Sequence, residues 1–209
     1  MIDSVSGGGA GALIGGATIS GGQAVVGATS QYVSLPSGLL GSTSAVTIEG
    51  WFYVSPTTNT SNIPRLFAVG SLGTQDVGVQ FSKSGLLTAC QYVSGTWSTL
   101  VGTSLSITSL GYFHVALVLT NLGYPQLYVN GMQTGSPSTT VTLPTPSQQS
   151  SFYLFKSVAG SQRGIAGSVD EFRIWSSALS PGEISANYKA GDSALNNSFD
   201  IVYCSFVEI

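Results

Sequence analysis

Short runs in which apolar and polar residues alternate recur along this chain, and Gly, Ser, Pro and Asn residues separate them. Such alternation is the pattern of a β-strand with one buried face. The run at 112–120 is almost wholly apolar, which is typical of a strand covered on both faces. Asn130-Gly131 directly follows the run at 126–129 and predicts a two-residue hairpin. The runs predict strands at 17–19, 31–35, 46–54, 65–69, 77–81, 86–93, 97–101, 112–120, 126–129, 140–143, 152–155, 168–175 and 201–207.

One helix is also predicted, near residues 181–190. Ser180 and Glu183 have the spacing of a capping box, Pro181 takes the first helical position, and Gly191 is expected to end the helix. About a dozen strands and one short helix predict an all-β fold, a β-sandwich. We expect a single domain over residues 1–209, with a Gly-rich and flexible start at 1–16.

The composition changes which functions are plausible. Charged residues make up only 7% of the chain, against about 25% in an average domain. Six cations cannot neutralise a row of phosphates, so we expect no nucleic-acid partner. No apolar run approaches the roughly 20 residues of a membrane span.

The first residues carry no secretory signal, since Met1-Ile2-Asp3-Ser4 leads directly into a Gly-rich segment. The charge-poor, hydroxyl-rich composition nevertheless suits an extracellular setting or the surface of a virion. The sequence therefore predicts one of these two locations.

Three segments, taken in order, resemble the laminin G-like branch of the concanavalin A-like jelly rolls. Their order and spacing are also similar to the pentraxin branch, and the similarity covers about residues 20–190. It implies an antiparallel jelly-roll β-sandwich, a fold that hosts lectins, adhesins, hydrolases and spacer modules, so function must be argued from a site. The segments are 31–36 with 46–54, 112–118 with 127–131, and 167–175 with 178–184.

No hydrolase activity is expected. Glycosidases that the chain resembles carry Glu-x-Asp-x-x-Glu on one strand, and that spacing is absent here. Asp170 and Glu171 are adjacent acids, but neighbours on a strand are expected to point to opposite faces. His114 lies inside an apolar strand and is interpreted as a packing residue.

Calcium is the one metal that the sequence leaves open. In pentraxins an acidic cluster follows the strand that 152–155 resembles, whereas Lys156-Ser157-Val158-Ala159 stands there in this chain. We therefore expect no cofactor and no calcium requirement, with a single structural calcium at Asp170 as the open possibility. The alternative is that Asp170 accepts backbone N–H groups while Glu171 pairs with Arg173.

Two aromatic residues are the candidates for a ligand site, Trp97 and Tyr92. Trp97 follows Ser94-Gly95, a turn signal, and is the best candidate for an exposed ring that stacks on a sugar. Tyr124 is a further candidate, whereas Trp51 is expected in the core.

The two cysteines, Cys90 and Cys204, are expected to remain separate buried thiols unless their strands are neighbours.

Two functions follow from these observations. The first is a non-catalytic structural, decoration or adhesion module of an extracellular or virion assembly, such as a phage capsid, acting as a symmetric homo-oligomer. The alternative is a lectin-like module that binds a glycan.

In the resembling domains a first strand lies beside the strand near the C-terminus. Residues 201–208 are predicted to fill that position, either within the chain or by exchange with a neighbour.

Overall fold

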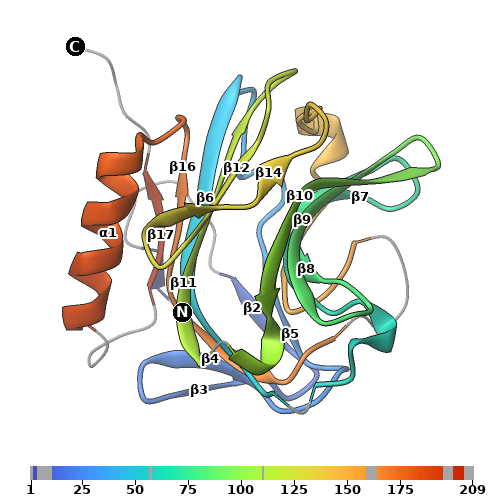
Figure 1. Cartoon of the computed structure of the whole chain (residues 1–209). Coiled ribbons are helices and arrows are strands. Elements are labelled where there is room, and N and C mark those ends of the chain that lie inside the picture. The colour runs from blue at the N-terminus through green and yellow to red at the C-terminus, as the bar shows by residue number, and fades with distance from the viewer. Residues whose placement is uncertain are drawn as a thin grey trace.

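Two β-sheets face each other across an apolar core, and one helix covers the outside of one of them (Figure 1). This computed structural model describes residues 2–3, 11–56, 58–109, 111–158, 164–194 and 200–204. The described strands form the two antiparallel layers of a jelly-roll β-sandwich, as the sequence predicts. The only parallel pairs among them are β1 with β17 and β17 with β16.

Sheet A is the layer beneath the helix. Its path runs β1-β17-β16-β6-β11-β12-β13, and the β3–β4 hairpin adds to β16. The bounds are β1 (Ile2–Asp3), β3 (Thr18–Ser20), β4 (Gln23–Val26), β6 (Ala45–Val54), β11 (Tyr112–Thr120), β12 (Gln126–Val129), β13 (Met132–Thr134), β16 (Gly167–Trp175) and β17 (Asp200–Cys204).

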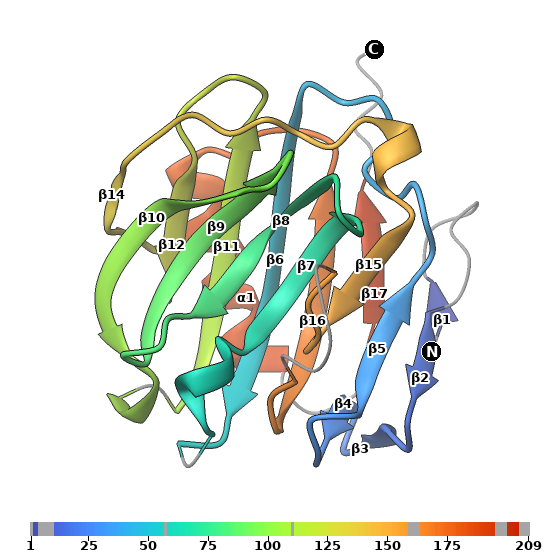
Figure 2. The same cartoon turned by 90° about the vertical axis from the view of Figure 1, so that its right-hand side faces the viewer.

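Sheet B is the opposite layer, seen face-on in Figure 2, with the order β14-β10-β9-β8-β7-β15-β5-β2. The bounds are β2 (Ala12–Ile14), β5 (Tyr32–Leu35), β7 (Arg65–Ser71), β8 (Gln75–Phe81), β9 (Leu86–Val93), β10 (Thr96–Ser106), β14 (Ser136–Pro137) and β15 (Ser151–Leu154). Short 3₁₀ turns lie at Thr60–Asn62, Ile107–Ser109 and Pro146–Gln148.

Phenylalanine rings fill the centre between the sheets. The Phe172 ring of β16 lies 6.4 Å from Phe52 of β6, 6.0 Å from Phe67 of β7 and 6.0 Å from Phe152 of β15. All four side chains are buried, so both sheets contribute to one apolar core. Edge-to-face pairs of this kind stabilise beyond the area that they bury.

Helix α1 (Pro181–Ala194) begins as predicted, since the Ser180 N–H and hydroxyl both donate to Glu183 Oε2 at 2.7 Å. It does not end at Gly191, as the sequence analysis expected. A Cβ on Gly191 would overlap Trp51 Nε1, so this glycine allows close packing of the helix on sheet A. The missing side chain is needed for packing and not for a C-cap.

Two further expectations need correction. Residues 140–143 form no strand, because Val141 N–H donates to Gly123 O and Thr142 N–H to Gln91 Oε1. Ala12–Ile14, inside the start expected to be flexible, pairs with β5 as strand β2. Gln23–Val26 is a strand that the sequence analysis missed. Residues 1 and 4–10 of that start lie outside the described residues.

The C-terminal strand lies in sheet A within the same chain. β17 pairs with β16, with Ile201 opposite Phe172 and Cys204 opposite Trp175. This is one of the two predicted arrangements, and residues 205–208 of the prediction lie outside the described residues. Cys90 is in sheet B and Cys204 in sheet A, so their strands are not neighbours.

Candidate functional site

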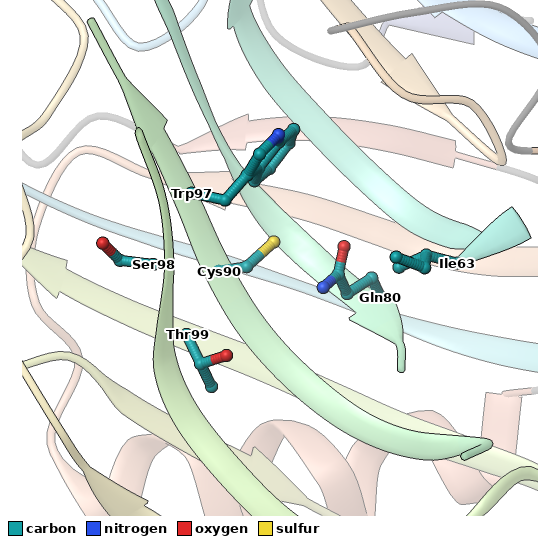
Figure 3. Close-up of a pocket in the computed structure, with 6 residues that line it drawn as sticks. All are labelled: Ile63, Gln80, Cys90, Trp97, Ser98 and Thr99. Carbon is teal, nitrogen blue, oxygen red and sulfur yellow. The ribbon is translucent and has the colours of Figure 1, made fainter. Parts of the chain in front are cut away.

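A small hollow opens on the outer face of sheet B (Figure 3). Sheet B is the layer that lies away from α1 (Figure 1). Its volume is about 250 Å³, and the residues around it are Ile63, Gln80, Cys90, Trp97, Ser98 and Thr99. Pockets for drug-sized ligands span about 300–1,000 Å³, so this hollow suits a ligand unit about the size of one sugar ring.

Strand register brings the hollow together. Trp97 of β10 lies opposite Tyr92 of β9, and Tyr92 lies opposite Asp76 of β8. The hairpin that carries Trp97 turns at Ser94-Gly95, where both residues have positive φ, as the turn signal predicts. The two predicted ligand residues, Trp97 and Tyr92, are therefore neighbours, with ring centroids 5.1 Å apart.

Trp97 is held in place by a cation that the sequence analysis did not single out. The Arg65 guanidinium carbon lies 4.8 Å from the Trp97 ring centroid. Trp97 remains 39% exposed, whereas Arg65 beneath it is fully buried. The indole thus forms a platform with one side supported by a cation–π contact.

The charge of Arg65 is balanced locally. Its Nη2 atom lies 3.3 Å from Asp76 Oδ2, both side chains are fully buried, and its Nη1 donates to Cys90 Sγ. A buried charge is tolerated only when it is paired in this way. The floor beneath Trp97 therefore carries no net charge from this pair.

Several buried polar atoms beside the hollow have no hydrogen-bond partner among the described residues. They include Arg65 Nε, Gln80 Oε1 and Thr88 Oγ1. The register places Arg65 opposite Gln80 and Gln80 opposite Thr88, so these residues form one row across three strands. A buried polar atom left without a partner costs about 1–3 kcal/mol, and a hydroxyl-bearing ligand would supply partners.

The rim of the hollow is strained. Ile63 has φ 51° and ψ 68°, in the left-handed region. This conformation is unfavourable for a β-branched residue, and such strain is concentrated at functional sites.

A comparison with protein-family models decides the family. The model described as the concanavalin A-like lectin/glucanases superfamily, of the laminin G type, matches residues 27–185. The chain belongs to this concanavalin A-like superfamily. The resemblance inferred from the three sequence segments is thereby confirmed. A search of curated proteins finds no match.

Solved structures with the same fold include both binding modules and enzymes. Domain 4 of AbnA, an extracellular arabinanase from Geobacillus stearothermophilus solved with arabinotriose, superposes with a TM-score of 0.71 at 20% identity, covering 88% of this chain and 91% of that one. A heptameric pentraxin from Limulus polyphemus gives 0.52 at 15% identity, covering 73% and 70%. Trypanosoma rangeli sialidase gives 0.62 at 18% identity, covering 87% of this chain but 29% of that one. At these identities the similarity establishes the fold alone.

On the other sheet of this concanavalin A-like domain, a polar cluster around Glu49 lies buried beneath α1. Glu49 Oε1 accepts from Trp175 Nε1 and from Asn187 Nδ2 of α1, both at 2.8 Å. His114 Nε2 lies 3.3 Å from Glu49 Oε2, and the His114 side chain is buried. The burial of His114 agrees with its interpretation as a packing residue, which stays a prediction.

Trp51 and Tyr124 differ in their exposure to solvent. Trp51 is 4% exposed and is stacked between Tyr112, at 5.5 Å, and Tyr188 of α1, at 5.4 Å. It is therefore a packing residue. Tyr124 is 64% exposed and is not among the residues around the Trp97 hollow.

The Asp170–Glu171 pair corrects one expectation. A β-bulge between Asp170 and Arg173, with Glu171 at φ 49°, breaks the alternation of the strand. Both carboxylates therefore lie near Tyr112, on the outer face of sheet A. Burial raises the pKa of Tyr112 above its ordinary value, and the charges of Asp170 and then Glu171 raise it further.

Both carboxylates have partners within β16. Asp170 Oδ1 accepts the Glu171 N–H at 2.9 Å, and Glu171 Oε2 pairs with Arg173 Nη2. These are the contacts of the alternative interpretation. Among the described residues, no three His, Cys, Asp or Glu side chains form a metal-binding group. That calcium is not required stays a prediction, with a single structural calcium at Asp170 as the open possibility.

The remaining expectations concern assembly and membranes. In the described part of the chain, no helix has the length and apolar character needed to span a bilayer. A role in a virion or other symmetric assembly, and a homo-oligomeric state, stay predictions. So does the assignment of residues 1–209 to a single domain.

Proposed function

We propose that this domain is a non-catalytic module that binds an uncharged carbohydrate in the Trp97 hollow. The observation that carries the proposal is the supported, half-exposed Trp97 ring beside polar atoms that have no partner among the described residues. An aromatic face suits the C–H face of a sugar ring, and acceptors such as Gln80 Oε1 suit its hydroxyl groups. The arabinotriose complex of the structurally similar arabinanase domain is consistent with this function.

The charge balance supports an uncharged ligand. Arg65 is the cation at the hollow, and it already pairs with Asp76 at 3.3 Å. A carboxylated sugar would find no uncompensated positive charge in this pair. Because the structurally similar arabinanase is described as extracellular, we infer the same location for the glycan ligand and for this domain.

Titration of Trp97→Ala against a panel of neutral and acidic oligosaccharides tests the proposal. Loss of an aromatic anchor at the centre of a binding site costs about 2 kcal/mol or more, so affinity for a neutral ligand should fall at least tenfold. Tyr124→Ala, which removes a more exposed ring outside the hollow, is the control and should bind normally. Unchanged binding by Trp97→Ala would refute the site.

A further inference from the structure

A second hollow, of about 460 Å³, lies on the outer face of sheet A, where the β3–β4 hairpin meets β6 and β16. Figure 1 shows this hairpin at the end of the sandwich, and the Trp97 hollow is on the opposite sheet. The polar residues around it are Ser20, Gln23, Tyr53, Ser55 and Ser168. They include hydroxyls, one amide and no charged side chain.

Tyr53 is the feature that distinguishes this surface. It is 42% exposed, while every residue from Val46 to Phe52 on the same strand is buried. Its exposure is close to the 39% of Trp97. The ring therefore offers a second accessible aromatic face beside hydroxyl groups.

The amide of Gln23 is oriented in advance. Ser168 Oγ donates to Gln23 Oε1 at 2.8 Å, and Gln23 Nε2 donates to the Tyr112 hydroxyl at 3.2 Å. These two bonds hold both ends of the amide, because each hydroxyl can donate or accept. The nitrogen carries two N–H groups, so a second donor remains for a ligand.

The charges nearby limit the ligand class. The charges of Asp170 and Glu171 help to raise the pKa of Tyr112, whose hydroxyl accepts the hydrogen bond from Gln23. Arg173 pairs with Glu171. An acidic sugar bound here would bring its carboxylate towards Asp170 and Glu171, so this surface disfavours acidic sugars. The strained bulge residue Glu171 lies in the same region, as is common near functional sites.

We propose that this hollow, defined by Tyr53, Gln23 and Ser168, is a second site for an uncharged sugar unit, so that one domain bridges two glycan chains. The inference rests on the proposed function of the Trp97 hollow. The two sites lie on opposite sheets, so a short oligosaccharide occupies only one of them. Two sites on one domain increase avidity for a polymer without any new contact at either site.

Calorimetric titration with arabinotriose, xylotriose, galactotriose and glucotriose, and with galacturonotriose as the acidic probe, tests this inference. Wild type should bind two molecules of a neutral trisaccharide, whereas Trp97→Ala and Tyr53→Ala should each bind one and the double variant none. Gln23→Ala should weaken the site that Trp97→Ala retains. Tyr124→Ala is the control for removal of an exposed tyrosine and should still bind two.

The outcomes separate the two proposals. If wild type has one site, and Trp97→Ala abolishes it while Tyr53→Ala leaves it intact, only the proposal of the second site is overturned. If wild type has one site and only Tyr53→Ala abolishes it, the Trp97 site is overturned and the site at Tyr53 is supported. Absence of binding to every probe overturns both.

Bridging gives an independent readout. Wild type should cross-link a branched arabinan or galactan into a turbid suspension, and each single variant should bind the polymer without turbidity. Light scattering of each protein alone shows whether it is monomeric. A monomeric Tyr53→Ala variant that still cross-links the polymer overturns the second site.

Discussion

The buried Arg65–Asp76 pair allows a quantitative test of how the Trp97 hollow is built. Replacement of Asp76 by Asn keeps the size of the side chain and leaves the Arg65 charge buried without its carboxylate. Both side chains are fully buried, with 3.3 Å between Nη2 and Oδ2. Removal of one member of such a pair costs about 3–5 kcal/mol, against about 0–1 kcal/mol for an exposed pair.

For a domain of this length, 1 kcal/mol corresponds to roughly 2–4 °C in melting temperature. We therefore expect Asp76→Asn to melt about 6–20 °C below wild type. Since whole domains are stable by about 5–15 kcal/mol, this loss is a large fraction of the total.

Urea unfolding, with the slope compared between variants, measures the free energy of unfolding directly. The double variant Arg65→Met/Asp76→Leu removes both charges and should recover most of the stability, because no unpaired charge remains. It should nevertheless bind glycan more weakly, since Trp97 loses its cationic support. A loss below about 1 kcal/mol in Asp76→Asn would mean that water solvates the pair, and the account of the hollow floor would be wrong.

Four further predictions concern the rest of the fold. Gly191→Ala should lower the free energy of unfolding by about 1–3 kcal/mol, measured in thermal melts, because its Cβ would overlap Trp51. Gly182→Ala is the control and should not destabilise, because its Cβ would meet only Ser180 Oγ, at an ordinary contact distance of 4.0 Å. Burial, and after it the charges of two nearby carboxylates, raise the pKa of Tyr112 in the folded state. The contribution of Tyr112 to the free energy of unfolding is therefore fully present below about pH 10 and is lost as the pH rises further. Tyr112→Phe should lessen this loss in thermal melts at alkaline pH. A calcium chelator should leave the melting temperature unchanged, and a drop of several degrees would instead reveal a calcium site. Deletion of residues 199–209 should give an insoluble or molten product, because it exposes the edge of β16 that pairs with β17; a soluble product with an unchanged melting temperature would contradict this role of the strand.

Much of the secondary structure could be predicted from the sequence because its signals are local. The apolar run at 112–120 is strand β11 with the same bounds, and the Asn130-Gly131 turn has positive φ at both residues. The capping box at Ser180 begins the helix as predicted. Alternation, turn chemistry and capping each depend on a few consecutive residues, so they can be recognised without knowledge of the tertiary fold.

The candidate site was predictable only in part. Trp97 and Tyr92 could be identified because they flank a recognisable turn and therefore face each other on neighbouring strands. Arg65 gave one signal, a charge at the start of an apolar strand in a chain with few charges. Nothing in that signal says that β7 lies near β10, because strand order is set by packing between distant segments.

Tertiary structure alone decided the remaining features. Gly191 has the sequence context of a helix end, yet the approach of Trp51 keeps it inside α1. A bulge that places two residues of β16 opposite one of β6 puts Asp170 and Glu171 on one face, against the alternation of a regular strand. The local sequence determined which segments become strands and where they turn. The register and neighbours of those strands, which depend on contacts far apart in the chain, determined which side chains meet to form a site.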